Sequence, residues 1–363
     1  MSIGAVGDTF PQQLNVLAPP TTMNLASVPS ILAPNLIAHF YPGSGAIARF
    51  RGLEAGAVVS PEDWVGSATK RYGHDLSGLS RLEDGGFLAD AIVKDPVAFL
   101  GPDHVEAFGV DTGLLVKLLD PGERLIVHSH PDRTFANRHL GCAHGKTEAW
   151  IVLSESPGEV FLGFDRQVAE EELAGWVASQ SIDEMLGSLN TLSVSRGDAV
   201  LVPAGIPHAI GAGVFAVELQ EPTDFSFALE HRNFTDPDLR LGWDLALSSV
   251  DRSAWPADRL ARLAGPGLKT AGRVLPAQAD PFFRADLVVS PEEETVGTGF
   301  AVLVVLDGSG EIISESAPPL PVSSGVTVLL PYGAGPARLT GDAVVIVCRP
   351  PVPGELSPAR PAV

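Results

Sequence analysis

Cysteine is scarce in this 363-residue sequence, which contains only Cys142 and Cys348. Because the two lie far apart along the chain, we expect no disulfide scaffold, and a reducing, cytoplasmic compartment is the natural interpretation. Long apolar runs are missing too, since no segment approaches the roughly 20 residues of a membrane span. The first residues, MSIGAVGDTFPQQLNVLAPP, lack the basic start and continuous apolar stretch of a signal peptide. We therefore expect a protein that is neither inserted in a membrane nor secreted.

Positive charge is also in short supply. The sequence has 24 Lys and Arg against 44 Asp and Glu, which gives a formal net charge of -20. Nucleic acids and anionic membranes both attract basic surfaces, so this balance argues against either as a partner. A small-molecule substrate is the better expectation.

Composition and length favour a large protein made mainly of β-strands. Hydrophobic residues make up 45% and charged residues 19%, and 31 prolines and 38 glycines are spread along the chain. This mixture is typical of a turn-rich globular β protein rather than of a disordered chain or a long helical bundle. The length allows two cored domains, or one domain with a large insertion.

Local patterns give a coarse map of the elements. Helical signals occur in residues 60–68, where Pro61 follows a possible capping Ser60, and in the segments FLADAIVKD and PDHVEAFG. The run AIARFRG at 46–52, by contrast, indicates a strand. Residues 197–203 (GDAVLVP) and 325–331 (GVTVLLP) are similar, which indicates two related β units. No histidine follows His231, so the second unit cannot repeat a histidine-rich site.

One short motif carries the strongest chemical signal. His128 and His130 are separated by one residue in a strand-like run, so both side chains point to the same face. Imidazole binds Zn, Fe, Mn, Ni or Cu, and a third imidazole with a carboxylate would complete a set of four ligands. Gly122 lies six residues before His128, while residues 197–208 fit G-x5-P-x-G-x2-H and end at His208. Both spacings coincide with the two motifs of the cupin β-barrels.

More extensive matches point to one cupin family. The segments LLVKLLDPGERLIVHSHPD (114–132), HGKTEAWIVL (144–153), RGDAVLVPAGIPHAIGAG (196–213) and VELQEPTDF (217–225) resemble type I mannose-6-phosphate isomerases. DWVGS (63–67) and the GFD at 163–165 also fit, so the resemblance covers most of the chain. It implies a mainly β fold with two cupin (jelly-roll) barrels and a small helical insertion.

Composition and local patterns along the chain also predict a domain plan. An N-terminal arm would occupy residues 1–30, and a catalytic metal-binding cupin domain residues 31–166 and 190–227. The helical insertion would occupy 167–189, a helical connection 228–275, and a metal-free cupin-like domain 276–363.

The family's site residues carry over by motif. The resemblance implies one divalent metal ion, with Zn expected and Fe, Mn or Ni as alternatives, bound by His128, His130, Glu148 and His208. It implies catalytic roles in sugar isomerisation for Lys146, Glu218 and Asp224, and it places Trp64, Arg133 and Arg232 at the substrate. The expected partner is a sugar or sugar phosphate. A proton would move between C1 and C2 of the sugar while the metal polarises its carbonyl.

Three positions depart from the family pattern. The first ligand is usually glutamine, and here it is His128. Ala228 occupies the place of an arginine, and Ile126 replaces a serine. These departures predict altered substrate specificity. Arg133, Arg138 or Arg232 are the candidates to replace the missing arginine.

Several of these residues also have simpler explanations. Trp64 could fill the core, Lys146 could be a surface lysine, and Glu218 and Asp224 could be ordinary carboxylates at a strand end and a turn. His139, His144 and Cys142 are interpreted as loop residues outside the site.

Two other functions remain open. Three histidines and a glutamate could bind Fe or Ni in a cupin dioxygenase. A catalytically inactive sugar-binding protein could retain the metal site after losing the arginine, because cupin barrels host many chemistries.

Overall fold

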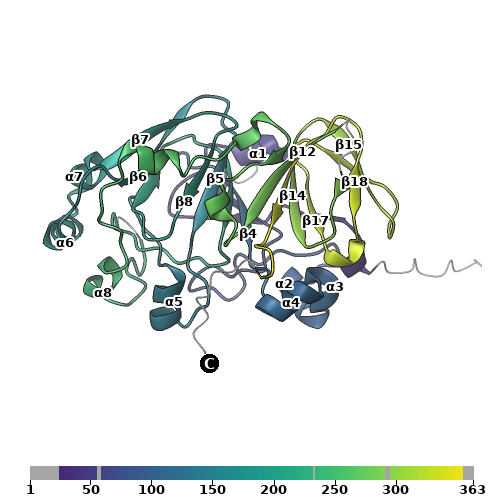
Figure 1. Cartoon of the computed structure of the whole chain (residues 1–363), viewed down its shortest axis with the longest axis horizontal. Helices are drawn as coiled ribbons and strands as arrows, with labels where there is room; N and C mark the ends of the chain where they lie inside the picture. Colours follow the sequence, from purple (N-terminus) through teal and green to yellow (C-terminus); the bar gives the residue numbers. More distant parts are fainter. Residues whose placement is uncertain (1–23, 55–58, 232–233, 291–294, 355–363) are drawn as a thin grey trace, which may run out of the picture.

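Two β-barrels lie side by side along the long axis of the molecule (Figure 1). The computed structural model describes residues 24–54, 59–231, 234–290 and 295–354. The first barrel combines a six-stranded and a three-stranded sheet, in the orders β2-β3-β4-β10-β5-β8 and β7-β6-β9. Their bounds are β2 (Leu36–Ile37), β3 (Glu62–Val65), β4 (Leu115–Leu119), β5 (Glu148–Val152), β6 (Gly158–Phe164), β7 (Leu189–Val194), β8 (Ala199–Val202), β9 (His208–Ile210) and β10 (Ala216–Gln220).

The second barrel also combines two sheets. Their strand orders are β1-β17-β14-β19-β12-β11 and β13-β18-β15-β16. The edge strand β1 comes from the N-terminal region and pairs antiparallel with β17. The bounds are β1 (Ser30–Ile31), β11 (Gly272–Arg273), β12 (Arg284–Val289), β13 (Thr295–Val296), β14 (Ala301–Asp307), β15 (Ser309–Ser314), β16 (Leu320–Ser323), β17 (Thr327–Leu330), β18 (Ala337–Leu339) and β19 (Val344–Arg349).

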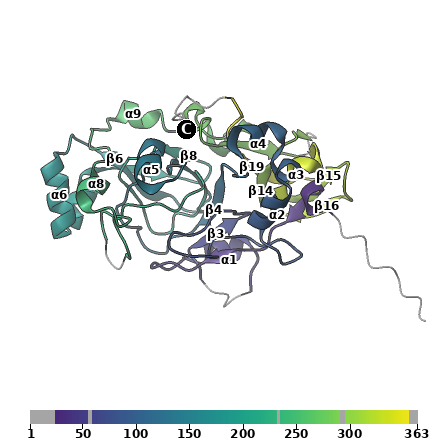
Figure 2. The same ribbon diagram turned by 90° about the horizontal axis from the view of Figure 1, so that it is seen from below.

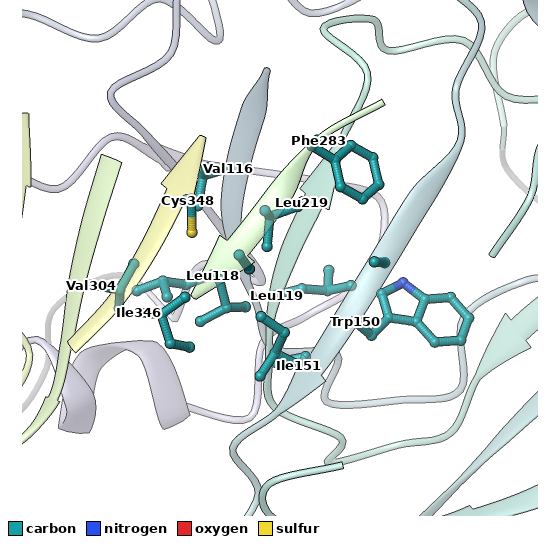
Figure 3. Close-up of a cluster of buried hydrophobic side chains, with 14 of the residues drawn as sticks. Val116, Leu118, Leu119, Trp150, Ile151, Leu219, Phe283, Val304, Ile346 and Cys348 are labelled. Atoms are coloured by element: carbon teal, nitrogen blue, oxygen red, sulfur yellow. The ribbon is translucent and has the colours of Figure 1, made fainter. Parts of the chain in front are cut away.

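The main core lies between the two large sheets (Figure 3). Side chains alternate along a strand, so Leu118 of β4 faces the second barrel while Lys117 faces the interior of the first. In β14, likewise, Val304 belongs to the core shared by both barrels, whereas Leu303 belongs to the interior of the second. Because both faces are covered, β4 is buried at every position. This explains the nearly continuous apolar run GLLVKLL.

Helices cover the ends of the barrels (Figures 1 and 2). The pair α6 and α7 occurs in the predicted helical insertion, and α2 to α4 lie beside the second barrel, where α3 contacts η4. No helix in the described ranges is long and apolar enough to cross a membrane. The bounds are α1 (Ala46–Phe50), α2 (Leu88–Lys94), α3 (Pro96–Leu100), α4 (Pro102–Phe108), α5 (Arg133–Leu140), α6 (Glu170–Ser179), α7 (Ile182–Gly187), α8 (Trp243–Leu247) and α9 (Ala257–Ala261), with the 3-10 turns η1 (Leu25–Ser27), η2 (Gly267–Lys269), η3 (Ala277–Ala279) and η4 (Tyr332–Ala334).

Two local predictions were wrong, in opposite directions. Residues 60–68 form no helix, because strand β3 pairs with β4 along its whole length. The run at 46–52 forms helix α1 instead of a strand. Asp120 caps this helix by accepting hydrogen bonds from Ala46 N at 2.7 Å and Ile47 N at 3.3 Å. In both cases a partner distant in sequence outweighs the local preference.

The mainly β prediction with a helical insertion is confirmed. The exact domain boundaries remain a prediction. Most of the predicted N-terminal arm, residues 1–23, lies outside the described residues.

Candidate metal centre

Three histidines converge at one end of the first barrel. The candidate ligand atoms of His128, His130 and His208 all lie within 4.8 Å of one another. His128 and His208 sit opposite each other and exchange two backbone hydrogen bonds, of 3.0 and 2.8 Å. His130 follows two residues after His128 and therefore points to the same side. Backbone pairing thus brings together ligands that are 80 residues apart in sequence.

The orientation of each ring is fixed by its Nδ1 atom. The Nδ1 atoms of His128, His130 and His208 each lie 2.8 Å from a backbone carbonyl oxygen, of Ile126, Phe225 and Ile206 respectively. A carbonyl can only accept, so each Nδ1 carries the hydrogen and each Nε2 keeps a lone pair. Histidines that bind metals are held in this way in many proteins.

The protonation behaviour of these rings suits metal binding. Burial and the neighbouring imidazoles hold the pKa of His128 well below its usual value. Burial and the nearby Lys146 ammonium lower the pKa of His130 to about 3. Neutral imidazole is the form that binds a metal ion. His128 and His130 are therefore in their ligand form over the whole neutral range.

Glu148 completes the cluster from the start of β5. Its carboxylate oxygens lie 3.1 Å from His130 Nε2 and 3.2 Å from His208 Nε2. These ring atoms carry lone pairs, so each contact brings two acceptors together and favours a cation between them. Within the described residues, Glu148 Oε2 and His208 Nε2 are buried without a hydrogen-bond partner. The donor set of three imidazoles and one carboxylate therefore fits a divalent transition metal.

Lys146 adds a positive charge beside this cluster. Its ammonium lies 3.4 Å from Glu148 Oε2 and 3.2 Å from His130 Nε2, and its side chain is buried. Burial by itself would raise the pKa of Glu148, but Lys146 and the imidazoles hold it well below its usual range. Glu148 is thus kept as a carboxylate, as a ligand must be.

The cluster opens into a cavity of about 370 Å³. The cavity is lined by His128, Glu148 and Lys146 from the cluster, together with Glu218 and Asp224. Two of the four predicted metal ligands and all three predicted catalytic residues therefore border one space. A volume of this size accommodates a small metabolite.

A second buried charge cluster shares the cavity. Lys117 Nζ lies 3.5 Å from both Glu62 Oε2 and Glu218 Oε2, and all three side chains are buried. Tyr41 donates a hydrogen bond to Glu62 at 2.5 Å, and Trp64 Nε1 donates another at 2.6 Å. Both carboxylate oxygens of Glu62 therefore accept hydrogen bonds. Burial would raise its pKa, but neighbours including His39 and Lys117 lower it well below the usual value.

Glu218 differs sharply from Glu62. Burial, with the charges of Glu148 and Glu62, raises the pKa of Glu218 to about 8 despite the nearby Lys117. A carboxyl group with this pKa can both donate and accept a proton near neutral pH. Two glutamates that contact the same lysine thus have opposite protonation behaviour.

The remaining predicted residues lie at different distances from the cavity. Asp224 lines it and accepts a hydrogen bond from Tyr72 N at 3.0 Å. Trp64 is fully buried beneath Lys117, whose ammonium lies 4.8 Å from its ring centroid, so it supports the wall from behind. Arg133 donates to Glu221 and to the Pro281 carbonyl and is not among the lining residues. Arg232 lies outside the described residues.

The departures from the family pattern at Ile126 and Ala228 differ in their position relative to the site. Ile126 lines the cavity, whereas Ala228 is completely buried and is not among the lining residues. An apolar side chain thus occupies the wall next to His128.

Sequence reasoning missed Glu62, Lys117 and Tyr41. Lys117 was visible as a single charge inside the apolar run GLLVKLL, which is unusual for a buried strand. Glu62 was hidden by the incorrect helix prediction for residues 60–68.

Comparisons with known proteins agree with this geometry. No family model matches the chain. The chain is 26% identical over 317 residues to mannose-6-phosphate isomerase ManA of Bacillus subtilis, covering 80% of this chain and 96% of that protein. It is 36% identical over 180 residues to the mannose-6-phosphate isomerase of Streptococcus mutans, covering 45% of this chain and 55% of that protein.

Solved structures show the same fold. Mannose 6-phosphate isomerase from Bacillus subtilis matches with a TM-score of 0.66 at 21% identity, covering 89% of this chain and all of that one. The enzyme from Salmonella typhimurium matches with a TM-score of 0.69 at 17% identity, covering 90% of this chain and all of that one. The resemblance to mannose-6-phosphate isomerases is thereby confirmed, and the low identities are those of a divergent relative.

Proposed function

We propose that this divergent relative of the mannose-6-phosphate isomerases is a metal-dependent aldose-ketose isomerase with altered substrate specificity. The observation that carries the proposal is the common cavity. It is lined both by His128, one of three clustered histidines oriented for metal binding, and by Glu218, a buried carboxyl group whose pKa lies near neutrality. An isomerase of this class needs both features, because it must hold a sugar oxygen and move a proton between neighbouring carbons.

We propose His128, His130, Glu148 and His208 as the metal ligands. Zinc is the proposed metal, because imidazole and carboxylate donors suit it and the relatives share this frame, although Fe, Mn and Ni accept the same donors. When bound, the ion would polarise the sugar carbonyl and make the hydrogen on the adjacent carbon more acidic.

Glu218 is the proposed acid-base residue. Its carboxyl group lines the cavity, and Lys117 lies 3.5 Å from it. In its ionised form it takes a proton from one carbon, and in its protonated form it returns a proton to the neighbouring carbon, while the hydroxyl proton passes to the former carbonyl oxygen. Lys117, held by Glu62, stabilises the ionised form of Glu218.

Lys146 and Asp224 are proposed to bind and orient the sugar. The Lys146 ammonium already lies within 3.4 Å of Glu148, so a sugar oxygen near the cluster would come within its reach. Asp224, whose carboxylate binds the backbone at Tyr72, is placed to accept hydrogen bonds from sugar hydroxyls.

A cytoplasmic location is proposed as well. Cys142 and Cys348 are both free thiols in the structure, and the acidic composition gives no basic surface for membranes or nucleic acids.

The direct test is to follow the hydrogen at C2 of a sugar. The protein, reconstituted with Zn or another divalent metal, is incubated anaerobically with aldoses, ketoses and their phosphates in deuterated water, and deuterium incorporation at C2 is followed by NMR. We expect incorporation together with formation of the isomeric sugar. A reaction that requires oxygen would instead indicate a dioxygenase, and sugar binding without exchange would indicate a binding protein.

A further inference from the structure

One basic side chain in the wall of the cavity differs from the others in lacking a carboxylate partner. The Lys and Arg residues among the described lining residues are Arg71, Lys117, Lys146 and Arg240. Three of them lie within 3.5 Å of a carboxylate, which is Glu62 or Glu218 for Lys117, Glu148 for Lys146, and Asp236 for Arg240. Arg71 forms no ion pair with any carboxylate in the described part of the chain. Its charge is therefore available to a ligand.

The guanidinium group of Arg71 also has hydrogen-bond donors to spare. Its Nη1 donates to the Ala38 carbonyl oxygen at 2.9 Å, and within the described ranges this is the one side-chain hydrogen bond that Arg71 makes. A guanidinium carries five N–H donors in a planar fork. Nε and Nη2 thus remain for another acceptor, and a phosphate or a carboxylate matches two parallel N–H groups of this kind.

The backbone around Arg71 is held in place by hydrogen bonds on both sides. Arg71 N donates to the Ser77 carbonyl at 2.8 Å, and the Arg71 carbonyl accepts from His74 N at 3.0 Å. The next residue, Tyr72, donates its backbone N–H to Asp224 Oδ2 at 3.0 Å. A donor group on a fixed backbone loses less conformational entropy when it binds a ligand, which favours affinity.

Arg71 and the metal cluster lie at different depths of the same cavity. Arg71 is half-buried, whereas the side chains of Glu148 and Lys146 are almost completely buried. A sugar whose carbonyl group reaches the buried histidine cluster therefore turns its other end toward the more exposed part of the cavity, where Arg71 lies.

We propose that Arg71 binds an anionic group at the far end of the sugar substrate, either a phosphate ester or a carboxylate, and thereby determines which sugars react. This inference rests on the proposed isomerase function and names a specificity residue for it. The phosphate ester and the carboxylate share the chemistry that Arg71 recognises, namely two oxygen atoms that accept parallel hydrogen bonds from one guanidinium. Arg71 acts on binding and takes no part in the proton transfer.

The proposal is tested by comparing each neutral sugar with its anionic forms. The metal-reconstituted full-length protein is assayed for C2 exchange with aldohexoses, with their 6-phosphates and with the corresponding uronates, which carry a carboxylate at C6. We expect kcat/KM for the better anionic form to exceed that for the neutral sugar by about 10- to 100-fold, the effect of a charge-assisted bidentate contact. The form that reacts faster identifies the anionic group. A neutral sugar that reacts as well as both anionic forms would overturn the proposal.

Substitution of Arg71 separates a binding role from a structural one. In Arg71→Gln, kcat/KM for the anionic sugar should fall by about 10- to 100-fold while that for the neutral sugar stays unchanged. Arg71→Lys keeps the charge but loses the planar fork, so its preference for the anionic sugar should lie between those of the wild type and Arg71→Gln. An equal fall for the anionic and the neutral sugar would show that Arg71 only supports the cavity wall, and would reject the proposal.

Two further kinds of variant locate the effect. Arg262→Gln is the matched control, because Arg262 pairs with Asp258 at the end of helix α9 and is not among the described residues that line the cavity. This variant makes the same change of charge and should keep the wild-type preference. Arg240→Gln and Arg232→Gln test the other candidate arginines. Loss of the preference in either of these, with none in Arg71→Gln, would contradict the assignment to Arg71.

Failure of the isomerase function can be told apart from failure of this inference. If no sugar exchanges its C2 hydrogen, binding of the same sugars to the wild type and to Arg71→Gln is measured by calorimetry. Tighter binding of an anionic sugar than of the neutral one by the wild type, lost in Arg71→Gln, would support the inference without the isomerase function. Equal affinities of the two proteins for the anionic sugar would refute it.

Discussion

The two barrels share one architecture but differ in the side chains that their large sheets direct into the barrel interior. In the first barrel, β3, β4 and β10 direct Glu62, Lys117 and Glu218 into the interior. In the second barrel, β14, β17 and β19 direct apolar side chains, including Leu303 and Val345, into a closed core. A buried charge is costly unless it is paired. The first barrel therefore buries charged side chains in the wall of its cavity at some expense of folding free energy, whereas the interior of the second contains closely packed apolar side chains.

This difference explains why, among the described residues, the cavity with buried titratable groups lies in the first barrel. Its inward charges offset one another, because Lys117 contacts both Glu62 and Glu218. The second barrel supplies stability, because its large sheet covers the outer face of the first (Figure 3). Substitutions in the two interiors should therefore affect different properties.

The largest effect is expected for His208→Ala. Removing one of three imidazoles should lower metal affinity by more than about 100-fold, since even residues that support a ligand are worth 10 to 100-fold. Metal content after dialysis, measured by mass spectrometry, checks this expectation. His104→Ala is the control, because His104 is also buried but bonds to the Asp111 carbonyl outside the cluster. Unchanged occupancy in His208→Ala would show that the site has been misassigned.

Glu218→Gln should act on the reaction and not on the metal. The amide keeps the shape but cannot exchange a proton, so kcat should fall by about 10²- to 10⁴-fold. Metal content should remain that of the wild type. A variant that keeps more than a tenth of the wild-type C2 exchange would exclude Glu218 as the acid-base residue.

Leu303→Ala should act in the opposite way, on stability alone. Leu303 is 1% exposed inside the second barrel, and truncation of such a residue costs about 2 to 5 kcal/mol of unfolding free energy. Denaturant unfolding monitored by circular dichroism measures this loss. Metal affinity and kcat/KM of the folded protein should not change. A drop in metal affinity would show that the two barrels are energetically coupled at the site.

The smallest effect is expected for the dependence of the first barrel's folding stability on pH, through His144. Although burial opposes it, two carboxylates raise the pKa of His144 to about 9: Asp111 accepts a hydrogen bond from His144 Nε2 at 2.9 Å, and Glu221 lies 3.9 Å from His144 Nδ1. Because the folded pKa is raised, this stabilisation is complete below the unfolded pKa near 6.5 and is lost as pH rises through about 9. The loss amounts to roughly 1 to 3 kcal/mol.

Hydrogen exchange can localise this pH effect. Amides near His144 and Asp111 should lose protection between pH 6.5 and 9.5 after correction for intrinsic rates, and those of β14 should not. In His144→Asn the difference should disappear. Equal loss of protection in both barrels would contradict the assignment to His144.

The amino-acid sequence alone was enough to predict the cluster of histidines and the fold class. His128 and His130 were predictable because strand alternation puts them on one face, and His208 because glycine and proline spacing marks the loop before it. The mainly β fold followed from composition and from the repeated strand pattern. These inferences depend on short-range geometry, which a sequence records directly.

Tertiary structure alone decided the rest of the site. Residues 60–68 have the local features of a helix, yet pairing with β4 makes them strand β3 and turns Glu62 toward Lys117. The pKa of Glu218, the placement of Trp64 behind the wall, and the binding of Arg133 by Glu221 also depend on neighbours far away in sequence. Burial and long-range pairing set these properties, and both arise only when distant strands meet.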